Sequence, residues 1–280
     1  MALSPLVVPQ AGQLCHRPPN RSEMDERNVP RTPAVVTVDP EHYDAVLFDL
    51  DGVLTSTAAL HTACWKRVFD RFLEDRAQRT GEPQDPFDPG ADYLRYVDGK
   101  PRAAGVRDFL ASRGIALPEA PFDAAPGDDS VQALANCKQE LVAEEIAAGH
   151  VEAFPGSVAW VRELHEQGLR TAVVSSSENC RAVLAAAGID GFFDVVVDGT
   201  DARELSLPGK PAPDTFLEAA RRLGVDPSRA VVVEDALAGV EAGRAGGFGL
   251  VIGVARTAAP EDLKEHGADV VVHDLAELLA

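Results

Sequence analysis

The sequence predicts an α/β protein in which a Rossmann-like parallel sheet, with helices on both faces, is interrupted by an inserted all-helical domain. From residue 154 onward, short apolar strands alternate with amphipathic helices, which is the pattern of a parallel sheet. One more strand of this kind is expected far upstream, at Ala45–Phe48. Helical patterns alone fill residues 58–151 between them. One strand, a helical insertion and then the rest of the sheet is the layout of a core domain with a cap.

The composition excludes several classes of protein. The chain has 280 residues, and its hydrophobic content of 45% is enough for a real core. A formal net charge of -19 would repel nucleic acids and anionic membranes. No apolar run approaches the roughly 20 residues of a membrane span. The N-terminus also lacks the basic residues with which a secretory signal peptide begins. The four cysteines form no C-x-x-C pair, which favours a reducing cytoplasm over a zinc site or a disulfide framework. We expect a soluble monomer.

The chain begins with a segment that we expect to be a disordered leader. Residues 1–40 are rich in proline and arginine and show neither a helical nor a strand period. We assign no chemistry to this leader. Met24 is the only methionine besides Met1, so translation could start at either residue.

The cap is expected at residues 58–151 and should contain three helical stretches. Apolar side chains recur every four residues from residue 60 to residue 72, which predicts an amphipathic helix. The second stretch, residues 92–113, is interrupted by a polar turn that contains glycine and proline. The third is long, and Asp129 or Ser130 is its candidate N-cap.

The core is expected at residues 41–57 and 152–280. Glycines 168, 188 and 224 stand where helices should end. Besides Ala45–Phe48, the expected strands are residues 171–174, 195–197, 230–233, 249–252 and 270–272.

Two carboxylates directly follow the first strand, in the run Asp49-Leu-Asp51-Gly52. Residues two apart in an extended chain point the same way, so both could reach one site at the carboxyl edge of the sheet. An isolated D-x-D-G is also typical of an Asx turn. The longer run DLDGVLTST resembles the first motif of the haloacid dehalogenase (HAD) superfamily, in the form FDLDGVL of its phosphotransferases. This resemblance implies that Asp49 is a nucleophile that forms an aspartyl-phosphate, that Asp51 is the general acid and base, and that Mg²⁺ is the cofactor.

Two further segments resemble the second and third HAD motifs. A serine-rich turn follows the strand at residues 171–174 and opens a helix, where serines are often simple N-caps. Its place in the chain resembles the second motif, which implies that a serine holds the phosphoryl group. The run K-P-x-P-D at residues 210–214 resembles the third motif, which implies that its lysine pairs with Asp49 and with the phosphoryl oxygens. The implied phosphate-binding residues are Ser175 with Ser176 as its rival, Asn179 as a neighbour, and Lys210. Glu178 would be unfavourable there if it faced the phosphate.

Acids also end the strand at residues 230–233, where they could cap the next helix. The run V-E-D-x-x-x-G resembles the fourth HAD motif, which implies that Asp235 ligates Mg²⁺ and that Glu234 does so directly or through water. The expected metal ligands are therefore four acids: Asp49, Asp51, Glu234 and Asp235. Two carboxylates about 4 Å apart repel by roughly 4 kcal/mol at an effective dielectric constant near 20, so gathering them requires a cation. Oxygen ligands suit magnesium.

The start of the cap resembles the corresponding segment of the β-phosphoglucomutases. In Thr55-Ser-Thr57-Ala-Ala-Leu-His61, the resemblance implies that Thr57 and His61 support the acid/base aspartate. A mutase must also hold a second phosphate far from the nucleophile, and arginine suits that task. The basic turn of the cap resembles this phosphate grip through Arg102, with Lys100 beside it and Arg107 in reserve.

The sequence therefore predicts an Mg²⁺-dependent HAD enzyme that converts β-glucose 1-phosphate to glucose 6-phosphate through a sugar bisphosphate. The nearest alternative is a phosphatase that hydrolyses small sugar phosphates with the same residues. A catalytically silent HAD-like interaction module is a third possibility, but all four motifs keep the residues that the chemistry needs. The expected partner is a small sugar phosphate.

Overall fold

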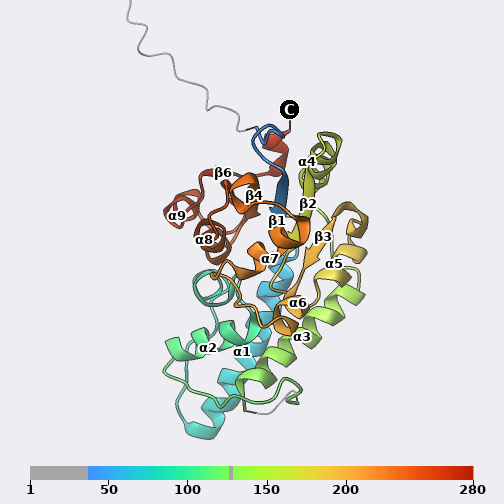
Figure 1. The fold of residues 1–280 in the computed structure, drawn as a ribbon. Helices are drawn as coiled ribbons and strands as arrows, with labels where there is room; N and C mark the ends of the chain where they lie inside the picture. The colour runs from blue at the N-terminus through green and yellow to red at the C-terminus, as the bar shows by residue number, and fades with distance from the viewer. Residues whose placement is uncertain (1–36, 126–128, 280) are drawn as a thin grey trace, which may run out of the picture. The chain divides into compact units, whose positions relative to one another are not determined.

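The computed structural model describes residues 37–125 and 129–279, which lie within one compact unit. Their strands form a single six-stranded sheet in which every pairing is parallel, in the order β3-β2-β1-β4-β5-β6 (Figure 1). The fold class expected from the sequence is confirmed. The strands are β1 (Ala45–Phe48), β2 (Arg170–Val174), β3 (Val195–Val197), β4 (Ala230–Glu234), β5 (Leu250–Val254) and β6 (Val270–Val272).

The first strand of the chain lies in the middle of the sheet. β1 pairs with β2 on one side and with β4 on the other, and all four of its residues are buried. Phe48, its last residue, is in register with Val173 and Val233. A strand that is covered on both faces reads as an unbroken apolar run, which is why the sequence signal was clear.

Helices cover both faces of the sheet. Trp160 of α4 (Pro155–Glu166) packs edge to face on Phe48. That face is completed by α5 (Cys180–Ala186) and by a C-terminal 3-10 helix, Leu275–Leu278. The opposite face is covered by α7 (Asp214–Leu223), α8 (Leu237–Ala245) and α9 (Pro260–Glu265).

The segment between β1 and α4 is helical, as expected, and it lies beyond the carboxyl ends of the strands (Figure 1). Its helices bury an apolar cluster of their own, separate from the clusters on the sheet, in which Phe69 stacks on Trp65 with ring centroids 5.0 Å apart. Ser130 caps the third helix by accepting a hydrogen bond from the amide of Ala133. The helical elements are α1 (Ala58–Thr80), a π-helix at Tyr93–Val97, α2 (Arg102–Ser112) and α3 (Val131–Ala147).

The chain enters and leaves this helical segment at neighbouring points. The amide of Ser56 donates to the carbonyl of Glu152 at 2.9 Å, and Thr55 forms an antiparallel bridge with Ala153. The two connections to the sheet are therefore hydrogen-bonded to each other.

Two details differ from expectation. The leader expected at residues 1–40 lies outside the described residues except for its end, where Val38 is only 4% exposed because it packs into the apolar core of the sheet. The structure also contains a short helix that the sequence analysis missed, α6 (Gly199–Glu204). It is six residues long and has no apolar stripe; its sequence signal is the capping box formed by Asp198 and Asp201.

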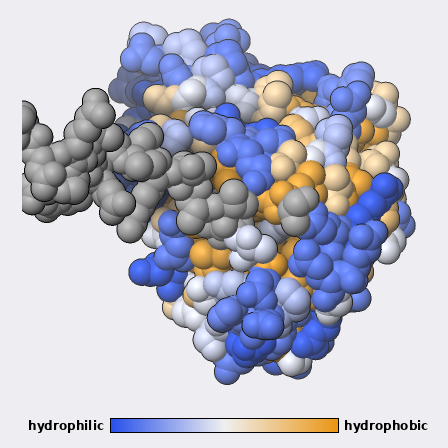
Figure 2. Space-filling model, turned by 90° about the horizontal axis from the view of Figure 1, so that it is seen from above, coloured by the Kyte–Doolittle hydropathy of each residue, from blue (hydrophilic) through white to orange (hydrophobic). Residues whose placement is uncertain are grey.

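The surface agrees with a charged-residue content of 25%, which is typical of soluble proteins. Seen from the end of the sheet opposite the helical segment, it is mainly hydrophilic, with apolar areas between hydrophilic ones (Figure 2). No helix in the described part of the chain combines the length and the apolar content that crossing a bilayer requires.

Candidate active site

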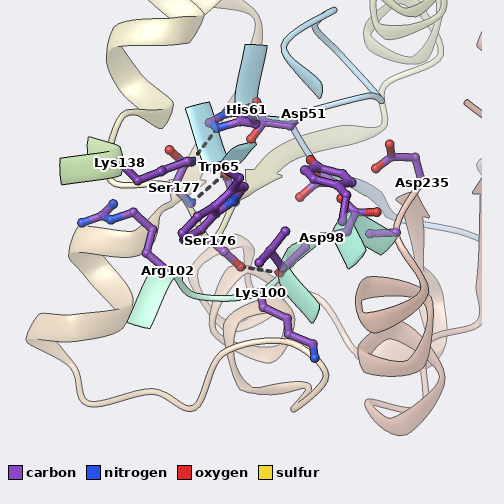
Figure 3. Close-up of a pocket in the computed structure, with 16 residues that line it drawn as sticks. Asp51, His61, Trp65, Asp98, Lys100, Arg102, Lys138, Ser176, Ser177 and Asp235 are labelled. Atoms are coloured by element: carbon purple, nitrogen blue, oxygen red, sulfur yellow. Dashed lines mark hydrogen bonds and ion pairs between the residues drawn. The ribbon is translucent and has the colours of Figure 1, made fainter. Parts of the chain in front are cut away.

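The carboxyl ends of three adjacent strands meet at one pocket, which the helical segment covers (Figure 3). Asp49 follows β1, Ser175 follows β2, and Asp235 follows β4. The amide of Asp49 still donates to the carbonyl of Val233 at 2.9 Å, so the sheet itself fixes where this carboxylate begins. Open α/β sheets bind their ligands at this edge.

Lys210 ties two of the acids together. It precedes α7, and its ammonium donates to Asp49 Oδ1 at 2.5 Å, to Glu234 Oε1 at 2.6 Å and to the carbonyl of Val174 at 3.1 Å. Its side chain is 1% exposed. Burial lowers the pKa of Lys210, but the Asp49 and Glu234 carboxylates outweigh burial and raise it above the ordinary value. The ammonium is thus permanently charged beside Asp49.

Three carboxylates could hold a cation. Asp49, Glu234 and Asp235 are buried, and one oxygen of each lies within 4.8 Å of the other two. Together with Lys210 they carry a net charge of -2, from three carboxylates and one ammonium, which matches a divalent ion. Burial and then the neighbouring acids raise the pKa of Asp235 well above its usual range, because nearby negative charges and the loss of water disfavour its ionised form. The donor set is oxygen only, which fits Mg²⁺.

Gly52 makes room for this group. Its φ is +85°, and a Cβ at this position would lie 1.9 Å from Asp235 Oδ2. Only glycine allows both this backbone angle and this approach. The glycine of the first motif is therefore explained by the acid of the fourth.

The Asp51 carboxylate does not belong to this cluster of three carboxylates. Its Oδ1 accepts hydrogen bonds from Thr57 Oγ1 and from His61 Nε2, the latter at 3.2 Å. Burial raises the pKa of Asp51, but the contacts with His61 and Thr57 outweigh it and bring the pKa down to about 2. The structure thus brings together three of the four expected metal ligands and directs the fourth side chain toward α1.

A buried lysine that the sequence analysis missed completes this arrangement. Lys138 of α3 is 6% exposed, and its ammonium donates to His61 Nδ1 at 2.6 Å. An ammonium cannot accept a hydrogen bond, so Nδ1 is the acceptor and Nε2 carries the proton that faces Asp51. Burial and then the charge of Lys138 lower the pKa of His61, which keeps the ring neutral. Lys138 therefore fixes the tautomer of His61.

A sequence signal for Lys138 did exist. It lies four residues after Leu134 and four before Val142, on the buried face of α3. A charged residue on an apolar helical stripe usually has a buried partner. Asp98, in the polar turn before α2, was missed as well: it lines the pocket, and burial followed by the charge of Glu234 raises its pKa to about 7.

The serine-rich turn approaches the polar turn of the helical segment. Ser175 and Ser176 both line the pocket, and Ser176 Oγ donates to the carbonyl of Gly99 at 2.9 Å. The Ser175 hydroxyl accepts from the amide of Ser177, another lining residue. Asn179, expected at the phosphate, is not part of the lining, because its amide group pairs with that of Gln139 in α3.

The basic side chains expected to hold a second phosphate have different surroundings. Arg102 lines the pocket, and its side chain is 11% exposed. Lys100 also contributes to the lining, but its ammonium donates to Asp108 at 2.6 Å, and Figure 3 shows it directed away from Asp51. Arg107 is half-exposed and pairs with Glu119. Arg102 is therefore the cation of this set that the structure presents to the pocket.

Comparisons with known proteins agree with this geometry. Residues 43–247 match the sequence model of the haloacid dehalogenase-like hydrolases. The chain is 51% identical over 255 residues to a protein of Mycobacterium bovis named beta-phosphoglucomutase. The aligned region covers 90% of this chain and 97% of that protein.

Solved structures have the same fold. A beta-phosphoglucomutase from Clostridium difficile superposes with a TM-score of 0.65 at 24% identity, over 85% of this chain and 93% of that one. CbbY from Rhodobacter sphaeroides, solved with phosphate, gives a TM-score of 0.63 at 26% identity, over 84% and 96%. With four motifs gathered at one pocket and a family match over most of its length, this chain belongs to the haloacid dehalogenase-like hydrolases.

Proposed function

We propose that this protein is a β-phosphoglucomutase that converts β-glucose 1-phosphate to glucose 6-phosphate through a sugar bisphosphate. The observation that carries the proposal is the shared pocket of a lysine-paired Asp49, a second acid held by Thr57 and His61, and the arginine Arg102. The relatives named beta-phosphoglucomutase support it, because the identity of 51% extends over nearly their whole length.

Asp49 is the proposed nucleophile. Its carboxylate oxygen attacks phosphorus, the bond between phosphorus and the sugar oxygen breaks, and an aspartyl-phosphate forms. Lys210 donates to Asp49 and can also neutralise phosphoryl oxygens that arrive beside it. The Ser175 hydroxyl lies at the end of the adjacent strand and is the proposed second phosphate contact.

Asp51 is the proposed acid and base. Ionised at first, it takes a proton from the sugar hydroxyl that attacks the aspartyl-phosphate, and it then gives this proton to the sugar oxygen that leaves phosphorus in the reverse direction. Two hydrogen bonds from Thr57 and His61 hold its carboxylate, and Lys138 holds His61. All three supporting residues belong to α1, its N-cap or α3, so we propose that residues 58–151 form a cap that completes the catalytic site on the core.

The proposed cofactor is Mg²⁺, held by Asp49, Glu234 and Asp235. Bound there, it would act as a Lewis acid that stabilises negative charge on the transferring phosphoryl group. The substrate is a sugar phosphate. A cytoplasmic location is part of the proposal, supported by the free thiols of Cys64 and Cys180. That the protein is a monomer stays a prediction.

Magnesium should stabilise the folded protein through Asp235. A ligand that binds only the native state at a hundred times its Kd contributes about 2.7 kcal/mol, which raises the Tm of a domain of this size by roughly 5 to 10 °C. We expect Asp235→Ala to lose most of this rise, measured by calorimetry with and without Mg²⁺. Asp190→Ala, an exposed aspartate, is the control and should respond like the wild type. Equal responses of all three proteins would place the metal elsewhere.

Arg102→Ala is the decisive test of the mutase. The bisphosphate must be held by its second phosphate while the first meets Asp49, so the variant should form glucose 6-phosphate roughly 10²-fold more slowly, the scale of about 3 kcal/mol. Hydrolysis of an aryl phosphate, which has no second phosphate, should change far less. The assay couples glucose 6-phosphate to a dehydrogenase, with bisphosphate as primer and released phosphate measured in parallel.

Arg107→Ala is the matched control for this experiment, because Arg107 lies on the same helix and pairs with Glu119 at the surface. It should keep wild-type mutase activity. A wild-type enzyme that releases only inorganic phosphate and free sugar would be a phosphatase. A mutase that tolerates Arg102→Ala but not Arg107→Ala would hold the second phosphate through Arg107.

A further inference from the structure

Glu178 lies in the turn between β2 and α5, and its carboxylate is the direct partner of Arg102. Arg102 Nη2 donates to Glu178 Oε2 at 2.9 Å, and the two side chains are only 11% and 18% exposed. The pair joins the helical segment to the core. In this structure, the guanidinium assigned to the second phosphate is therefore already bound by a carboxylate.

Arg102 keeps unused donors in this pair. A guanidinium offers five N–H groups in a planar fork, and a phosphate can accept two of them side by side. Glu178 accepts from Nη2, while Nε is buried and finds no acceptor among the residues that the structure describes. A buried donor without a partner is unfavourable, so Arg102 is incompletely satisfied. A phosphate dianion, with more acceptor oxygens and more charge, can displace the carboxylate.

Arg203 of α6 holds the other oxygen of Glu178. Its Nη1 donates to Oε1 at 2.8 Å, and its guanidinium carbon lies 4.2 Å from the centroid of the Phe122 ring. Neither contact involves the pocket lining. Glu178 thus keeps a cationic partner when Arg102 turns to another anion, and the retained pair is electrically neutral beside the incoming phosphate.

We propose that Glu178 is a competitor built into the phosphate grip, and that it sets the affinity and the specificity of Arg102 for the second phosphate. Before substrate binds, the Glu178 carboxylate pairs with Arg102. The second phosphate of the bisphosphate then takes the place of this carboxylate on Arg102, and Glu178 stays paired with Arg203. Anions with less charge than a phosphate dianion fail to displace it. The inference rests on the proposed function, because it requires a substrate with a second phosphate.

The test measures binding of β-glucose 1,6-bisphosphate by calorimetry, in the full chain with Mg²⁺ and with Asp49→Asn in every protein to prevent turnover. Adding Glu178→Gln should tighten binding about tenfold, the effect of one negative charge ~6 Å from a dianion and screened as in water. Glu204→Gln removes the same charge from the exposed residue next to Arg203 and should change binding less than twofold.

Arg203→Gln gives a second, independent measurement. It should weaken bisphosphate binding about threefold when Glu178 is present, because the displaced carboxylate then lacks a cation. In the Glu178→Gln background its effect should be smaller, because a neutral amide needs no cation and only the more distant charge of Arg203 is lost. This coupling distinguishes competition from a merely structural ion pair, whose loss would lower the Tm without tightening binding.

The outcomes separate the two proposals. If Glu178→Gln leaves binding unchanged or weakens it, while the parent still binds the bisphosphate more tightly than glucose 1-phosphate, Glu178 positions Arg102 or is a bystander, and the inference alone fails. If the parent binds the bisphosphate no more tightly than glucose 1-phosphate, both the mutase proposal and this inference are overturned.

Discussion

Asp49→Asn is expected to lower turnover by about 10⁵-fold or more, because an amide has nearly the shape of the carboxylate but cannot become an acyl-phosphate. The protein should stay folded. The side-chain oxygen can still accept from Lys210, and the change removes one charge from a crowded buried group. Turnover is measured as glucose 6-phosphate formation and as aryl phosphate hydrolysis, and both should be lost.

The control for this variant is Asp190→Asn at the exposed surface, which should keep full activity. The thermal melt of the Asp49→Asn protein reports whether it is folded. Steady turnover by a sample free of deamidated protein would show that Asp49 is not the nucleophile, and the site would then require another acceptor for the phosphoryl group.

Asp51→Asn should slow sugar phosphate conversion by 10² to 10⁴-fold, the usual contribution of general acid and base catalysis. The nucleophile and its lysine remain, so an aryl phosphate with a leaving group that needs no proton should still phosphorylate Asp49 in a first burst of leaving-group release at a rate much closer to the wild type. The comparison of the two substrates is the measurement. Equal losses on both would indicate damage to the site, and equal retention would remove Asp51 from proton transfer.

The central sheet was predictable because its signals are local. The apolar run of β1 is buried on both faces, and an acid, a serine or a glycine marks the end of such a strand in sequence. The meeting of Asp49 with Asp235 follows from topology alone, since β1 and β4 are adjacent and parallel. Sequence therefore predicted which strand ends meet at the pocket.

The partners of the site residues were not predictable in the same way. Lys138 and His61 are 77 residues apart, and Arg102 and Glu178 are 76 apart. A side-chain contact over such a distance depends on how two elements pack, and no periodic pattern in either element encodes it. Asn179 shows the same limit, because its place in the motif suggested phosphate while its amide group binds Gln139.

The hydrogen-bonded contact between the two connections at Ser56 and Glu152 has an evolutionary consequence. Because the helical segment leaves and rejoins the sheet at a single hydrogen-bonded point, its length and sequence can change without altering the spacing of any strand. The gene can therefore exchange this helical segment while the strand ends that line the pocket are inherited unchanged. Pocket-lining residues of the helical segment, Arg102 among them, can then change while the strand ends at the pocket keep their places.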